Sequence, residues 1–263
     1  MMMNENVICR PTLLVLMMLF LVGCSVKEQR DDCPCRLVLD FSQTDVSSIE
    51  ELRVSLAEES SQVYEKCADL EDFIPEYVIS APREELSLMV CSDDRGFFDD
   101  SRGMVIPYGR DCPRLYMYCT NLDCRDESVR DTVHMNKNHC VVDIFMDYDE
   151  SFEYRLCVKG NVDGYGLDGR PHKGQFSYSP SQEDDGGYEV SLPRQVDTSL
   201  LLEIDDGTEV LKTFSLGEYI KAGGYDWSAP DLEDLTVHVN WAVTTVSISV
   251  SGWNWVYECE IVI

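Results

Sequence analysis

Apolar and polar residues alternate with a period of two along most of this 263-residue chain. Successive side chains of a strand point to opposite faces of a sheet, so this alternation predicts half-buried β-strands. The runs are short and end at Asp, Ser, Gly or Pro, which is typical of a sandwich or barrel. Their alternating positions are Leu37/Leu39/Phe41, Leu52/Val54/Leu56, Leu86/Leu88/Val90, Leu115/Met117/Cys119, Cys140/Val142/Ile144, Phe152/Tyr154/Leu156/Val158, Leu200/Leu202/Ile204 and Val210/Lys212/Phe214. We therefore expect an all-β fold.

The strongest strand pattern closes the chain, from Leu235 to Ile263. Apolar residues there alternate first with Thr, His and Asn, then with Ser, and finally with Glu. A long, flat terminal strand invites pairing with another chain unless it is already paired. The run from Trp253 to Ile263 is thus expected either to complete its own sandwich or to contribute to a joint with another subunit.

The alternation breaks once in the middle of the chain. Between Asn121 and Thr132 the sequence becomes highly charged and loses its apolar positions. This break predicts two sandwiches, an N-terminal one over residues 33–131 and a C-terminal one over residues 132–263. Residues 65–73 are the one segment for which the sequence favours a helix.

The beginning of the chain has the zones of an export signal. Arg10 precedes an apolar run, Leu13 to Val22, which is too short to span a bilayer because a spanning helix needs about 20 residues. The run ends in Leu21-Val22-Gly23-Cys24, which resembles a bacterial lipobox, in which the Cys thiol is diacylated and becomes the new N-terminus. We predict a signal peptide over residues 1–23, lipid on Cys24, and a polar tether over residues 24–32. A plain secretory signal or a short anchor helix is the alternative.

The chain is strongly acidic. It has 21 Lys and Arg residues against 49 Asp and Glu, for a formal net charge of -28. Such a charge repels nucleic acid and anionic headgroups, so no nucleic-acid binding is expected and the lipid alone should contact the membrane.

Removal of Cys9 and Cys24 leaves ten of the twelve cysteines in the mature chain. An even number in an exported protein permits disulfides. Several of these cysteines lie in apolar strand runs, where a free thiol packs as a small hydrophobe. The sequence therefore favours a mixture of free and bridged thiols, and the loop-placed candidates for bridges are Cys33/Cys35 and Cys112/Cys124. The spacing of Cys33-Pro34-Cys35 is wrong for a zinc knuckle, so no metal is expected.

No catalytic motif is present in the sequence: it has no GxSxG, HExxH, phosphate-loop or GxGxxG pattern. The four His are scattered, and no partner for general-base catalysis is evident. The segment from Asn161 to His172 resembles a calcium loop but lacks the acidic residue at its last position, so a hairpin turn is the better interpretation. We expect no catalytic residue, no cofactor and no enzymatic activity.

Four tryptophans could form an aromatic platform for a sugar or a protein partner. Trp241 and Trp255 are in phase with apolar strand faces, which indicates core packing. Trp227 and Trp253 lie beside Gly and Asp turns, and they remain the candidate partner-binding residues.

The C-terminal half contains a series of motifs: Ser191-Leu192-Pro193-Arg194, Ser199-Leu200-Leu201-Leu202, Leu216-Gly217-Glu218-Tyr219-Ile220, Gly224-Tyr225-Asp226-Trp227, Asp231-Leu232-Glu233-Asp234-Leu235 and Val250-Ser251-Gly252-Trp253. In their order and spacing these motifs resemble the FimB-type fimbrial anchor family of the fimbrillin superfamily. Before residue 131 the resemblance is looser and rests on Cys33-Pro34 to Leu37.

The resemblance implies two tandem transthyretin-like (Greek-key) β-sandwiches and an outer-membrane lipoprotein that faces the cell surface. Such a protein anchors a fimbria, and nucleates or terminates it, by binding stalk subunits through strand addition. Stalk subunits of this superfamily lose their first strand to a protease, but an anchor would lose its lipid as well, so the bond between Arg36 and Leu37 is expected to stay intact. The alternatives are a surface glycan-binding lipoprotein or a fimbrial tip adhesin with host or bacterial surface ligands.

Overall fold

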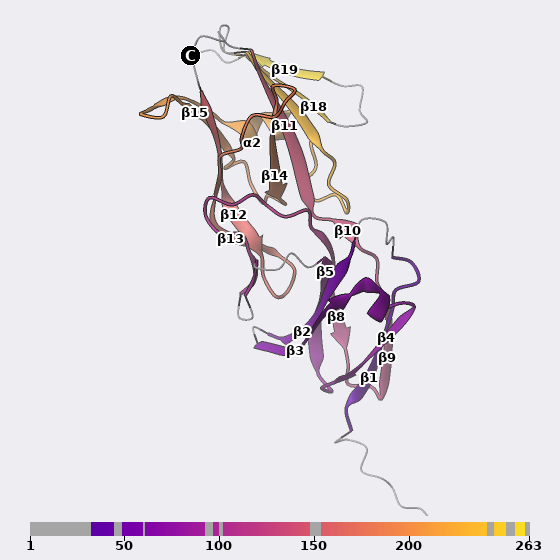
Figure 1. Ribbon diagram of the computed structural model, residues 1–263. Helices are drawn as coiled ribbons and strands as arrows, with labels where there is room; N and C mark the ends of the chain where they lie inside the picture. Colours follow the sequence, from indigo (N-terminus) through magenta and orange to yellow (C-terminus); the bar gives the residue numbers. More distant parts are fainter. Residues whose placement is uncertain are drawn as a thin grey trace, which may run out of the picture. The chain divides into compact units, whose positions relative to one another are not determined.

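Figure 1 shows the computed structural model, which describes residues 33–44, 49–59, 61–92, 97–99, 102–147, 154–240, 245–250 and 256–260. Strands make up nearly all of the regular structure in these residues, so the all-β prediction is confirmed. Residues 34–263 form one compact unit. Cys24 and Trp253 lie outside the described residues, as do the predicted signal peptide and most of the tether.

Two sheets enclose the first hydrophobic core. One has the strand order β4-β1-β9 and the other has the order β10-β8-β5-β2-β3. Both sheets contribute alternate side chains to this core, for example Leu37 and Leu39 from β1 and Leu52 and Val54 from β2. The strands are β1 Cys35–Asp40, β2 Glu51–Glu58, β3 Ser61–Asp69, β4 Glu76–Ala81, β5 Glu85–Ser92, β8 Tyr116–Asp123, β9 Ser128–Thr132 and β10 Asn136–Lys137.

Two further sheets enclose the second core. One has the order β14-β11-β17-β18-β19, and the other has the order β16-β15-β12-β7-β6, with β13 also paired to β12. The strands are β6 Phe98–Asp99, β7 Gly103–Val105, β11 His139–Asp147, β12 Arg155–Tyr165, β13 Pro171–Tyr178, β14 Tyr188–Pro193, β15 Leu201–Asp205, β16 Val210–Phe214, β17 Leu235–Asn240, β18 Thr245–Val250 and β19 Val256–Glu260.

The two halves repeat one strand arrangement. In the first half, β1 lies between β4 and β9, and the facing sheet contains β8-β5-β2-β3. In the second half, β11 lies between β14 and β17, and the facing sheet contains β16-β15-β12 followed by β13. The first strand of each half is antiparallel to one neighbour and parallel to the other. This repeat supports two sandwiches of the same topology, and the boundary between residues 131 and 132 stays a prediction.

Two hairpins extend the repeat. The β6–β7 hairpin comes from the first half of the sequence but joins the second half, where Met104 pairs with Tyr165 of β12. A Cβ on Gly103 would lie 2.3 Å from the Tyr165 carbonyl oxygen, so this approach requires glycine. At the other end, β19 pairs with β18. Residues 256–260 of the C-terminal run therefore join their own sheet.

Three local predictions have clear outcomes. The expected helix over residues 65–73 is wrong, because strand β3 continues to Asp69 and only a short 3-10 turn, η2 Leu70–Asp72, follows. The charged segment before residue 132 contains a strand, β9, which pairs in parallel with β1. The hairpin interpretation of residues 161–172 is confirmed, since β12 and β13 flank a turn there.

Cys33, Cys35, Cys119, Cys124, Cys140 and Cys157 are free thiols. Cys112 lies in the second core and Cys124 in the first, so the predicted pairing of these two is wrong. Cys33 is exposed whereas Cys35 is buried. Most of the other cysteines pack as small hydrophobes within strands, as their apolar surroundings predicted.

Candidate partner-binding groove

A groove of about 1020 Å³ lies at one end of the second sandwich. Its walls are the end of β11, the start of β12 and the segment that connects β13 to β14. The residues that matter for its chemistry are Phe145, Met146, Asp147, Tyr154, Arg155, Leu156, Pro180, Asp185 and Tyr188.

One wall has an open backbone edge because β14 is shorter than β11. Pairing between them ends at Ile144 and Tyr188, and a turn through Gly186, whose φ is +86°, precedes β14. The last three residues of β11, from Phe145 to Asp147, continue to pair with β17 on their other side. No described strand pairs with these three residues on the β14 side.

The opposite wall is open for a similar reason. Pairing between β12 and β13 begins only at Val158 and Tyr178, although β12 itself begins at Arg155. Two residues after Tyr178, Pro180 has no N–H to donate, which prevents β13 from continuing along β12. Residues 155–157 pair with β15 on one side, and no described strand covers their other side.

The first sandwich provides an internal comparison. There every residue of β1 pairs with β4, from Cys35↔Ala81 to Asp40↔Glu76. Strand β2 pairs with β3 along its whole length, interrupted only by a register shift after Leu56. The equivalent ends of β1 and β2 are therefore paired, so the gaps beside β11 and β12 do not come from the shared topology.

The floor of the groove is the exposed end of the second hydrophobic core. Met146 follows Ile144 in phase on the inward face of β11, and Tyr154, the residue before β12, is in phase with buried Leu156. Met146 and Tyr154 are half-buried and pack against the core, and Tyr188 is 5% exposed. An incoming apolar side chain would bury surface here at a gain of about 25 cal/mol per Å².

The rim of the groove is acidic. Asp147 and Asp185 line it, and Arg155 is the one basic residue among those lining it. Burial raises the pKa of the nearby Asp143 carboxyl, and the surrounding carboxylates, including Glu189 and Asp185, raise it further. The groove thus combines an apolar floor, two open strand edges and a negative rim.

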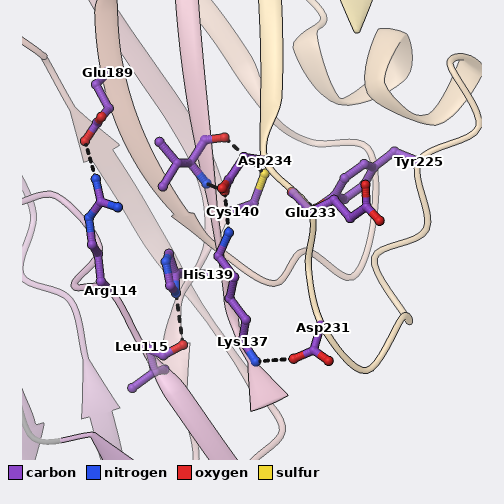
Figure 2. Close-up of polar contacts among 11 residues, drawn as sticks. Arg114, Leu115, Lys137, His139, Cys140, Glu189, Tyr225, Asp231, Glu233 and Asp234 are labelled. Carbon is purple, nitrogen blue, oxygen red and sulfur yellow. Dashed lines mark hydrogen bonds and ion pairs between the residues drawn. The ribbon is translucent and has the colours of Figure 1, made fainter. Parts of the chain in front are cut away.

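A network of polar contacts connects neighbouring segments near β11 (Figure 2). Lys137 Nζ lies 2.6 Å from Asp234 Oδ1, which also accepts a hydrogen bond from Val141 N–H at 2.7 Å. The Lys137 N–H donates to Asp231 Oδ1 at 2.7 Å. The two aspartates of the Asp231–Leu235 motif therefore hold the start of β11, which is a structural role.

His139 is the buried histidine of this network. Its Nδ1 lies 3.0 Å from the Leu115 carbonyl oxygen (Figure 2), and burial lowers its pKa. Burial outweighs the carbonyl contact, which by itself would favour the protonated ring, and the buried imidazole has a structural role. The described residues contain no group of three or more His, Cys, Asp or Glu that could hold a metal ion.

Arg194 organises the loop that contains Trp227. Its guanidinium donates to the carbonyls of Trp227, Ala229 and Pro230 and to Asn138 Oδ1. The Arg194 N–H also donates to the Tyr165 hydroxyl at 2.9 Å, a group that in turn bonds the Asn138 carbonyl. The Pro193-Arg194 motif and the Gly224–Trp227 motif therefore meet in space.

Trp227 is half-buried and packs against the second core, with its ring 4.7 Å from that of Tyr225. It does not line the groove. The other predicted site residues, Cys24 and Trp253, lie outside the described residues. The sequence placed Tyr154 and Leu156 in an alternating strand run, but it did not indicate Met146 or the open edges. The open edges depend on where one strand stops pairing with its neighbour, and the pattern of a single strand does not reveal that.

No described helix is both long and apolar enough to cross a membrane. The described α-helix, α2 Leu216–Ala222, contains the Leu216–Ile220 motif and buries Leu216 and Ile220 in the second core.

No protein-family model matches the chain. No curated protein matches it either.

Several solved structures share the fold. A candidate adhesin from Bacteroides ovatus matches with a TM-score of 0.58 and 10% identity, covering 86% of this chain and 96% of that one. A candidate polysaccharide-binding protein from Bacteroides thetaiotaomicron matches with a TM-score of 0.59 and 13% identity, covering 86% and 98%. The fimbrial anchor protein Mfa2 from Porphyromonas gingivalis matches with a TM-score of 0.59 and 13% identity, covering 84% and 98%. Identities this low show a common fold alone, so the FimB-type resemblance stays a prediction.

Proposed function

We propose that this protein is a fimbrial anchor: a lipoprotein of the outer membrane that faces the cell surface and binds the stalk subunit of a fimbria. The observation that carries the proposal is the groove of the second sandwich, whose two strand edges end without a partner among the described residues. Strand addition needs such an edge, because main-chain hydrogen bonds supply the affinity and alternating side-chain pockets set the register.

The occupant we propose is an extended segment of the stalk subunit. It pairs with an open edge and places alternate apolar side chains against Met146, Tyr154 and Leu156. Basic residues on its flanks would meet Asp147 and Asp185 on the rim. A segment with these features is complementary to the groove in shape, hydrogen bonding and charge.

The membrane contact is assigned to lipid on Cys24. Two acyl chains give stable anchoring where a single chain gives only marginal binding. The likeness to a fimbrial anchor structure supports this function.

The groove is tested by Met146→Arg in the source bacterium. Met146 is half-buried, so an arginine can direct its charge toward solvent while obstructing the apolar floor. We expect a folded, surface-displayed protein that no longer retains fimbriae, measured by immunogold labelling and by fimbrial antigen in the medium. Val210→Arg is the matched control, because Val210 is 51% exposed on β16 away from the groove.

Normal fimbrial retention by the Met146→Arg variant would refute the groove as the joint. Loss of fimbriae in the Val210→Arg variant instead would place the joint at β16.

The anchor assignment has separate tests. Cys24→Ser should release both the protein and its fimbriae into the medium. Immunogold label along the filaments or at their far ends would contradict a basal position and favour a tip adhesin. Trp227→Ala should leave fimbriae on the cell, whereas loss of saturable glycan binding in that variant would favour the glycan-binding alternative.

A further inference from the structure

Two buried cysteines meet where the first strand begins. Cys35 opens β1 and Cys124 directly follows β8, and both are 0% exposed in the first hydrophobic core. Both side chains belong to the same buried cluster, and after burial the neighbouring Cys35 thiol is the main cause that raises the pKa of the Cys124 thiol. Neither the sequence spacing nor the predicted pairs, Cys33/Cys35 and Cys112/Cys124, indicated this combination.

The backbone of both cysteines contacts the segment from Ala81 to Glu84, and the residue after Cys35 contacts the segment that follows Cys124. Cys35 pairs with Ala81, and the N–H of Cys124 donates to the Glu84 carbonyl at 2.9 Å. The Arg36 N–H donates to the Glu127 carbonyl at 3.0 Å, three residues beyond Cys124. These contacts place the backbone of both cysteines at the same end of the first core.

We propose that Cys35 and Cys124 form a disulfide that ties the first strand to the end of β8. The oxidant is a small disulfide or a disulfide oxidoreductase. One cysteine thiolate attacks the oxidant disulfide and expels one thiol. The second cysteine thiolate then attacks this mixed disulfide and expels the other thiol. Two cysteine thiols thus lose two protons and two electrons, and the oxidant disulfide becomes two thiols.

Burial determines when this bond can form and how long it lasts. Both thiols are inaccessible once β1 is in place, so the exchange occurs during folding, before the strand docks. Burial also raises the pKa of the Cys124 thiol, which keeps it protonated and unreactive in the folded chain. A reductant outside the protein would likewise reach the finished bond slowly.

The cross-link bears on the lipid tether, and this consequence rests on the proposed function. Arg36 is exposed beside the bond that a trypsin-like protease would cut. In the bridged protein, a cut after Arg36 leaves the segment that carries Cys24 attached to Cys124 through Cys35. The anchor would therefore stay on its lipid even when its first strand is cleaved.

The test is to refold the full chain from denaturant with oxidised glutathione, alkylate the remaining thiols with N-ethylmaleimide, and map linked tryptic peptides. The expected product joins the peptide 31–36 to the peptide 115–125. These peptides also contain Cys33 and Cys119, so the experiment is run in a Cys33→Ser, Cys119→Ala background. Alkylation of both Cys35 and Cys124 would overturn the proposal, as would a link in the unmodified chain that uses Cys33.

Stability gives a second measurement. The bridge closes a loop of about 90 residues, so reduction should lower Tm by on the order of 10 °C, and Cys124→Ser should abolish this response. The matched control is Cys91→Ala, because Cys91 and Cys119 are diagonal neighbours on β5 and β8, too distant for a disulfide. Fimbrial retention is not part of either readout, so the bridge can fail without the anchor function failing.

Discussion

Replacement of Asp111 by Asn should stabilise the protein at neutral pH. Asp111 accepts a hydrogen bond from the N–H of Ser191 on β14, the short strand beside the groove, at 2.9 Å. Burial raises the pKa of its carboxyl to about 6, and the negative charge of Glu189 raises it further. The backbone hydrogen bonds from Ser191 and Cys112 partly oppose this rise. A carboxyl whose pKa is higher in the folded protein than in the unfolded chain makes folding less favourable wherever it is ionised.

The magnitude follows from the pKa change. A rise from 3.8 to about 6 corresponds to about 3 kcal/mol, and solvent screening at this partly exposed group reduces the expected effect to about 1–2 kcal/mol. This penalty is complete above pH 6 and is relieved as pH falls toward 3.8, because the folded protein then holds the proton more tightly. Asn retains an oxygen that can accept from Ser191 and carries no charge at any pH.

The assay is urea unfolding of the wild type and Asp111→Asn at pH 7.5 and pH 4.5. We expect the variant to be more stable by about 1–2 kcal/mol at pH 7.5, which corresponds to about 3–6 °C in Tm, and to have a clearly smaller advantage over the wild type at pH 4.5. Asp126→Asn, at an exposed site, should show no such pH-dependent gain. An Asp111→Asn advantage of the same size at both pH values would refute the electrostatic explanation.

Three other substitutions or deletions test the structure. Arg194→Ala should cost about 3 kcal/mol in urea unfolding because it leaves the carbonyls of the Trp227 loop without their donor, and Lys should restore less than half of this loss. Gly103→Ala should cost at least about 2 kcal/mol, because the added Cβ would collide with the backbone of Tyr165 at a φ of +90°. Deletion of residues 256–263 removes β19 and should lower the amount of folded protein, measured by protease resistance; a folded, surface-displayed deletion variant without fimbriae would instead assign β19 to the subunit joint.

The alternation of apolar residues predicted most strands because a half-buried strand needs one apolar face. It failed where this reason is absent. Strand β3 has no buried residue, so its pairing with β2 leaves no apolar period in the sequence, and residues 65–69 were mistaken for a helix. Strand β9 is similarly hidden, because its charged residues form exposed ion pairs such as Arg130 with Asp40 and Glu76.

The candidate site was less predictable than the fold. Tyr154 and Leu156 were expected to face inward, and they do, but the groove exists because β13 and β14 stop short of their neighbours. That depends on register between distant segments, which one sequence does not reveal. Helix α2 was missed because its seven residues are too few for a helical period to stand out among strands.

The open edges of the second sandwich also create a hazard, since an edge that admits a partner strand can admit another copy of the same chain. The net negative charge of the protein opposes such self-association. Each molecule carries a formal charge of -28, and the groove itself is bordered by Asp147 and Asp185. Because screening shortens the range of this repulsion from about 10 Å at 0.1 M salt to about 3 Å at 1 M, concentrated salt should promote self-association through the groove, measurable by light scattering. The negative charge of this protein thus disfavours pairing between two copies of the same chain.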